Sequence, residues 1–173
     1  MSRQSPAPGL TEVLADHVCD PGRRPDDAAL DLAETVMVDT IGVALAAVGD
    51  PAVTSLLAAI GLGTGSSTVL VSGDRADARD AALIGGTAAH ALDFDDVDDA
   101  MIGHPSAVLV PTVLAVGEQT DASGYDVLDA YWTGLTTARA VALALDVSRH
   151  YALGWHSTAT IGALAAAAAA SRL

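Results

Sequence analysis

The spacing of apolar positions along the chain predicts a protein built mainly from helices. Between residues 28 and 48, apolar side chains recur about once per helical turn, which indicates a long, mostly buried helix. Asp26 or Asp27 stands just before it, where a carboxylate accepts the free N–H groups of a first turn. The positions expected to face inward are Leu32, Val36, Ile41 and Leu45.

Similar patterns predict further helices and one short extended segment. Pro111 is expected to kink or interrupt its helix, and Ser123 can cap the next one. The β-branched run 67–73 favours a brief strand, and 149–155 is predicted to be a turn. The additional helices are predicted over 10–19, 51–60, 77–94, 105–119, 123–147 and 157–172, with Ala81, Ala82, Ile84, Ala88 and Leu92 inward in the third.

Together these elements predict an all-α fold. Hydrophobic residues make up 51% of the 173 residues but aromatic residues only 3%, so most apolar side chains are small. Small side chains let helices approach closely. We therefore expect a compact, alanine-rich bundle of six or seven helices in a single domain over 10–173, preceded by a flexible tail over 1–9.

The charge balance limits the classes of partner. The chain has eight arginines, no lysine and 22 acidic residues, with a formal charge of −14, so nucleic acid and anionic membrane surfaces are disfavoured. The longest uncharged apolar run, 159–170, is too short to span a membrane. A single cysteine, Cys19, and the absence of an apolar leader favour the cytoplasm. The lysine-free, alanine-rich composition resembles that of high-GC bacteria.

Five aspartates fall within the seven positions 93–99, between His90 and His104. An EF-hand calcium loop is excluded, because Val97 and Asp98 replace the required oxygen ligand and glycine. A transition-metal site from His90, Asp93 and His104 is chemically reasonable, although we expect no metal. A solvated acidic loop explains Asp98 and Asp99 better than it explains Asp93.

Asp93 and two histidines are the candidates for proton transfer. Asp93 lies between Leu92 and Phe94, and burial next to apolar neighbours raises the pKa of a carboxyl group. His104 precedes Pro-Ser and His156 precedes Ser-Thr, each at a predicted helix start. Helix starts favour anions and neutral imidazole, but a purely structural capping role remains open for each histidine.

Three segments resemble the MmgE/PrpD family. They are GTAAHALDFDD (86–96), GHPSAVLVPTVLAVGE (103–118) and GWHSTATIGALAAAAAA (154–170), and MVDTIGVALAA (37–47) resembles the family's early helix. The resemblance implies a helical domain and an α+β lid domain, usually in a homodimer. It also implies cofactor-free lyase or isomerase chemistry on di- and tricarboxylates, as in 2-methylcitrate dehydratase, cis-aconitate decarboxylase and iminodisuccinate epimerase. The implied catalytic residues are Asp93, His104 and His156.

The sequence departs from the family pattern in ways that bear on function. Val97 replaces a threonine, Gly85-Gly86-Thr87 replaces Asn-Gly-Thr, and the family's lid is expected to be absent. We expect a small carboxylic acid substrate, bound with the help of Ser106, Ser157, Arg139 and Arg149, although surface ion pairs are a competing role for both arginines. A homodimer or a separate lid-domain chain would complete the site. The alternatives are a non-catalytic helical remnant or scaffold, and a pocket adapted to a less charged substrate in a biosynthetic pathway.

Overall fold

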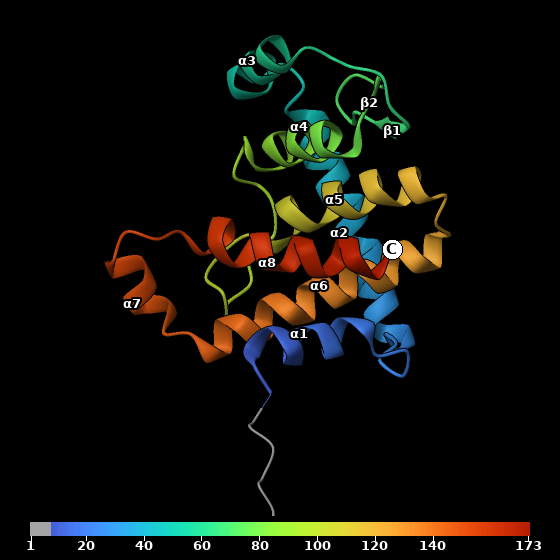
Figure 1. The fold of residues 1–173 in the computed structure, drawn as a ribbon. Coiled ribbons are helices and arrows are strands. Elements are labelled where there is room, and N and C mark those ends of the chain that lie inside the picture. The colour runs from blue at the N-terminus through green and yellow to red at the C-terminus, as the bar shows by residue number, and fades with distance from the viewer. Residues whose placement is uncertain (1–7) are drawn as a thin grey trace, which may run out of the picture.

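The computed structural model describes residues 8–173 and confirms an all-α fold (Figure 1). Within these residues there are eight helices and one two-stranded antiparallel sheet, so the expected count of six or seven was too low. Most of the expected tail lies outside the described residues. The elements are α1 (Leu10–Cys19), α2 (Asp27–Ala46), α3 (Pro51–Ile60), β1 (Ser67–Thr68), β2 (Arg75–Ala76), α4 (Ala78–His90), α5 (Pro105–Thr120), α6 (Gly124–Ala144), α7 (Val147–Ala152) and α8 (Ser157–Arg172).

Side-chain caps account for several helix starts. Asp26 accepts a hydrogen bond from the N–H of Ala29, as the sequence predicted. Ser123 and Asp126 form a reciprocal capping box at the start of α6, which confirms the predicted cap. These local bonds explain why the sequence located those two helix starts correctly.

Helices α5, α6 and α8 form the centre of the bundle, with α2 crossing behind them (Figure 1). Helices α3 and α4 and the small sheet lie at one end, and α1 packs at the other. One hydrophobic cluster joins α2, α5, α6 and α8, and a second lies around α4 and the sheet. Helices α6 and α8 approach closely at Gly134, where a Cβ atom would lie 2.9 Å from Ala169 Cβ.

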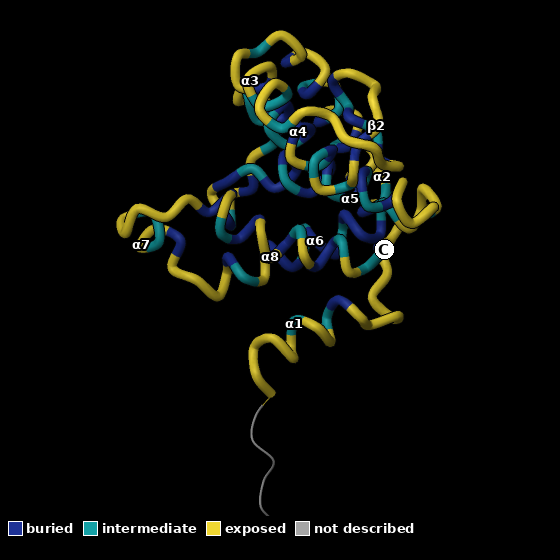
Figure 2. Tube along the Cα trace, turned by 45° about the horizontal axis from the view of Figure 1, so that its top comes forward, coloured by how far each residue is buried: buried dark blue, intermediate teal, exposed yellow. Residues whose placement is uncertain are grey.

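The predicted inward face of α2 was partly wrong. Leu32 and Leu45 are each 50% exposed, while Val36 and Ile41 are only partly buried. Figure 2 shows burial along the whole trace, with exposed residues dominating α1. The buried stripe uses mostly smaller side chains, because close helix packing leaves little room for larger ones. Its members are Ala29, Ala33, Met37, Thr40 and Ala44.

Three other elements differ from the sequence prediction. Helix α4 ends at His90 rather than at 94, because the backbone enters the left-handed region at Asp93 (φ 55°). Helix α5 continues through Pro111 without a break. The short helix α7 occupies most of the segment predicted to be a turn, with Asp146 accepting from the N–H of Arg149 at its start.

Within residues 8–173 no single helix combines the length and apolar character needed to cross a membrane. The pair α2 and α3 reaches that length and composition only when taken together, and the two helices meet at an 84° bend.

Candidate functional site

The loop between α4 and α5, residues 91–104, carries the acidic segment and is held against the start of α8. Its two sides meet in a bridge in which the N–H of Asp98 donates to the carbonyl of Gly103. The hydroxyls of Tyr151 and Ser157 donate to the carbonyl of Ile102. The N–H of His104 donates to Thr158 Oγ1 at 3.0 Å. Segments 49 to 55 residues apart in the sequence are thus joined beside His104.

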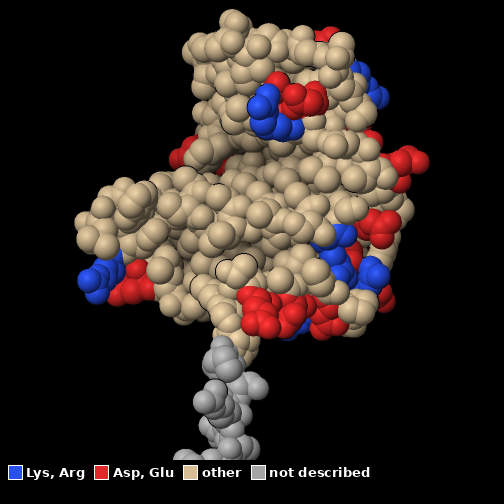
Figure 3. All heavy atoms as spheres, viewed as in Figure 1, with Lys and Arg blue, Asp and Glu red and all other residues tan. Residues whose placement is uncertain are grey.

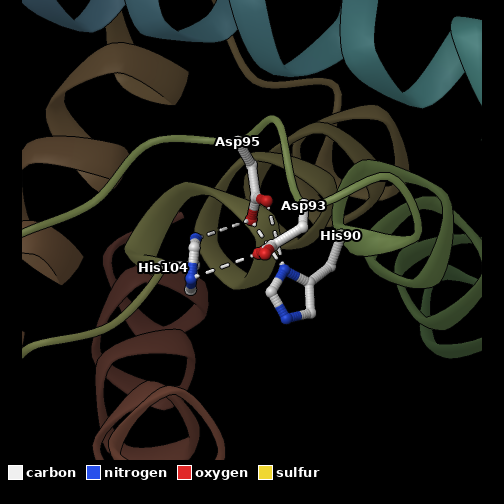
Figure 4. A group of neighbouring side chains, drawn as sticks. All are labelled: His90, Asp93, Asp95 and His104. Carbon is white, nitrogen blue, oxygen red and sulfur yellow. Dashed lines mark hydrogen bonds and ion pairs between the residues drawn. The ribbon is translucent and has the colours of Figure 1, made fainter.

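Four side chains converge at this loop (Figure 4). His90 Nδ1 lies 3.0 and 3.1 Å from the two carboxylate oxygens of Asp95. His104 Nδ1 lies 3.4 Å from Asp95 Oδ2, and His104 Nε2 lies 3.7 Å from Asp93 Oδ1. The two imidazole centroids are 4.7 Å apart. We call His90, Asp93, Asp95 and His104 the His–Asp group.

The sequence predicted that Asp93 is buried, but in the structure Asp95 is the buried carboxylate. The Asp93 side chain is 79% exposed, whereas the Asp95 side chain is fully buried. The positive φ at Asp93 turns the chain, so that Phe94 faces solvent and Asp95 points inward. Sequence reasoning missed Asp95 because this turn, rather than the apolar neighbours Leu92 and Phe94, decides which carboxylate is buried.

His104 occupies the N-cap position of α5, but its side chain makes no capping hydrogen bond. That function falls to Asp96, which accepts from the N–H and the hydroxyl of Ser106 at 3.1 and 2.6 Å. Ser106 is buried, and its Oγ also lies 2.8 Å from the hydroxyl of Tyr131. We therefore assign Ser106 an internal role and leave it out of the candidate site.

Two groups in the hydrogen-bonded series Asp96–Ser106–Tyr131 have shifted pKa values. Burial raises the pKa of Tyr131 to about 12, so the phenol stays protonated and donates toward Ser106. Burial also raises the pKa of Asp96, although the hydrogen bonds from Ser106 oppose that rise. The first turn of α5 thus already has its own carboxylate and does not need one from a substrate.

His156 is the N-cap residue of α8 and is exposed. Its ring meets Tyr151 edge-on at 5.6 Å, and its side chain makes no capping hydrogen bond. Within residues 8–173, no hydrogen bond, ion pair or ring contact joins the His156 side chain to the His–Asp group. The neighbouring Ser157 is buried and bonded to Tyr151 and Ile102, so it too has an internal role.

The two predicted substrate-binding arginines occupy different environments. Arg139 forms an ion pair with Asp98, which is the competing role that the sequence left open. Asp98 is buried and also accepts from the N–H groups of Ala100 and Met101, so its expected solvation was wrong, while Asp99 is exposed. Arg149 is exposed on α7.

A mostly apolar groove of about 560 Å³ begins at His90 and Thr158 and runs between α4 and α5. A larger hollow of about 820 Å³ lies between α2 and the loop joining α5 to α6, and none of the predicted site residues lines it. Arg75 and Glu118 on its wall pair with each other at 3.4 Å. We place the candidate site at the His–Asp group because two imidazoles and two carboxylates converge there, beside a groove to which His90 contributes.

The His–Asp group also has the composition of a metal site. One ligand atom from each of its four residues lies within 4.8 Å of the others. Two imidazoles and two carboxylates suit zinc or non-haem iron. However, His90 Nδ1 is directed at Asp95 rather than at a shared centre. The geometry therefore fits a hydrogen-bonded acid–base group better, and the expectation of a cofactor-free site stays a prediction.

Comparison with known proteins agrees with the resemblance found in the sequence. Residues 12–173 match the MmgE/PrpD N-terminal domain. A cis-aconitate decarboxylase-like protein of Aspergillus oryzae, oryM, is 34% identical over 100 residues. That match covers 54% of this chain but only 21% of the relative. Because the domain match covers nearly all of the described residues, the chain belongs to the MmgE/PrpD family.

Proposed function

We propose that this chain carries catalytic groups of an enzyme that removes a proton next to a carboxylate of a small carboxylic acid. Dehydration, decarboxylation and epimerisation all begin or end with such a transfer. The observation that carries the proposal is the pair Asp93 and His104, whose Oδ1 and Nε2 atoms lie 3.7 Å apart in front of buried Asp95. A proton-transfer group must come within about 3 Å of the atom that it serves.

The groove beside His90 bears on the kind of acid. Its lining is mostly alanine, leucine and valine, and its polar side chains are those of Thr87, His90, Thr112 and Thr158. Such a surface favours an acid that carries an apolar substituent. An acid of this kind also suits the overall charge of −14, because that charge repels polycarboxylates at long range.

The test is deuterium incorporation and product formation, followed by ¹H NMR in D₂O. Cis-aconitate, citrate and monocarboxylic acids with and without an alkyl chain are incubated with the full chain. We expect deuterium next to a carboxylate or a lyase product, and loss of at least about 100-fold in Asp93→Asn and His104→Asn. Asp99→Asn, on the same loop but exposed, is the control. Absence of exchange and product for every acid contradicts the proposal and favours the scaffold alternative.

We further propose that a second copy of the chain covers α8. The exposed face of this helix is formed by Ala159, Ala163, Leu164 and Ala167, and it lies in a broad area without charged side chains (Figure 3). An uncharged face of this kind favours association. Light scattering coupled to size exclusion should give a dimer that Leu164→Asp converts to monomer. A monomer in the unsubstituted protein contradicts this proposal.

A further inference from the structure

The carboxylate of buried Asp95 lies close to the Nδ1 atoms of two histidines, His90 and His104. Its carboxylate lies 3.0 Å from Nδ1 of His90 and 3.4 Å from Nδ1 of His104. A buried carboxylate is tolerated only when donors or opposite charges satisfy it. The two imidazoles are the groups placed to do so, and each can donate only if its Nδ1 carries a proton.

His104 has a particular need for this partner. Its Nδ1 is shielded from solvent and has no hydrogen-bond partner with good geometry in residues 8–173. The carboxylate oxygen of Asp95, at 3.4 Å, is an acceptor that a small rotation of the ring brings into range. Catalytic hydrogen bonds are often long before substrate binds and shorten afterwards.

We propose that Asp95 is a positioning residue that holds His104 in the tautomer with the proton on Nδ1. The unprotonated Nε2 then faces Asp93 and solvent, where it can accept a proton. His90, held by the same carboxylate, packs against His104 and limits the tilt of its ring. The arrangement has the form of a base oriented by a third group. Its catalytic consequence rests on the proposed function, but the tautomer itself does not.

The experiment is long-range ¹H–¹⁵N NMR of the full, ¹⁵N-labelled chain at a pH where the imidazoles are neutral. We expect His90 and His104 to show the Nδ1–H tautomer in the unsubstituted protein. In Asp95→Asn the amide can donate to Nδ1, so His104 should move to the Nε2–H tautomer. Asp99→Asn should leave both histidines unchanged. If Asp95→Asn does not fold, His90→Gln serves instead, because it keeps Asp95 and should leave His104 in the Nδ1–H form.

Three results overturn the inference: an Nε2–H tautomer of His104 in the unsubstituted protein, no change in Asp95→Asn, or a spectrum that changes on treatment with EDTA. The last result assigns the tautomer to a bound metal. With an acid that reacts, Asp95→Asn should lower kcat by about 100-fold with little change in KM. Correct tautomers without any turnover leave the inference intact and contradict only the proposed function.

Discussion

The main-chain N–H of His104 donates to the side-chain hydroxyl of Thr158, which ties the start of α5 to the start of α8. Gly103 makes this approach possible. A Cβ on Gly103 would lie 2.8 Å from Thr158 Oγ1 and 2.7 Å from Ser157 Oγ. The position of His104 therefore depends on a glycine that has no chemistry of its own.

Gly103→Ala should displace His104 from α8. Overpacking of this kind costs about 1–3 kcal/mol in the free energy of unfolding. A displacement near 1 Å also lowers turnover by about 100-fold. Urea unfolding and the deuterium-exchange assay measure the two effects. Gly63→Ala, where an added Cβ meets no atom of residues 8–173 within 4 Å, should leave both quantities near their original values.

Two substitutions of Asp93 separate the effect of its charge on activity from the effect of its backbone geometry on stability. Its φ of 55° lies in the left-handed region, which asparagine adopts readily and alanine does not. Asp93→Asn should keep the free energy of unfolding but lose activity. Asp93→Ala should lose activity and about 1 kcal/mol of stability as well. Equal stability of the two variants in urea contradicts the backbone argument.

The raised pKa of Asp96 predicts a pH-dependent stability. The folded protein holds this proton to a higher pH than the unfolded chain, whose ordinary value is 3.8. Between the two pKa values the folded state binds more protons, so this carboxyl lowers stability as pH rises. Asp96→Asn removes the titration. Its stability relative to the unsubstituted protein should therefore increase from pH 4 upward, whereas exposed Asp99→Asn should show no such trend.

The tight packing of α5 and α8 against Gly134, and the open space beside Gly42 on α2, predict opposite effects of the same substitution at these two glycines. Gly134→Ala places a Cβ 2.5 Å from Leu109 Cδ2 and should cost about 1–3 kcal/mol. Gly42→Ala, on an exposed position of α2 where the added Cβ meets nothing described within 4 Å, should stabilise by up to about 1 kcal/mol. Chemical denaturation gives both values, and equal signs contradict the packing argument.

Buried Asp129 connects α1, α6 and α8 through two arginines. Its Oδ2 lies 2.8 Å from Arg24 Nη1 and 3.0 Å from Arg172 Nε, and Arg172 also donates to the carbonyls of Val18, Asp20 and Arg23. Arg172→Ala should cost about 3 kcal/mol, because it leaves a buried carboxylate with one partly exposed partner. Arg24→Ala should cost less. Thermal or urea unfolding ranks the two, and the reverse order contradicts the assignment.

The sequence predicted most of the fold because most of the helix signals are local. Helices α1, α3 and α8 begin and end where the pattern placed them, and the caps at Asp26 and Ser123 act between neighbours. The wrong face of α2 has a different cause. With so many alanines, periodicity of large residues no longer marks the buried stripe, and the packing partners decide which side faces inward.

The candidate site was predictable only in part. His104 and Asp93 lie together, as expected from the motifs, but nothing local distinguishes buried Asp95 from its exposed neighbours in the run of aspartates. The distinction arises from the turn at Asp93 and from the contact of the loop with α8. Both are set by tertiary structure.

The cap supplied by Asp96 links the order of the acidic loop to the first turn of α5. The side chain that caps a helix usually belongs to the N-cap residue itself, but in α5 it belongs to Asp96, eight positions before the N-cap residue His104. Opening of the loop therefore frays the helix and releases the imidazole of His104 in the same event. The loop and the histidine therefore form one cooperative unit. A ligand that binds the ordered loop would stabilise both together.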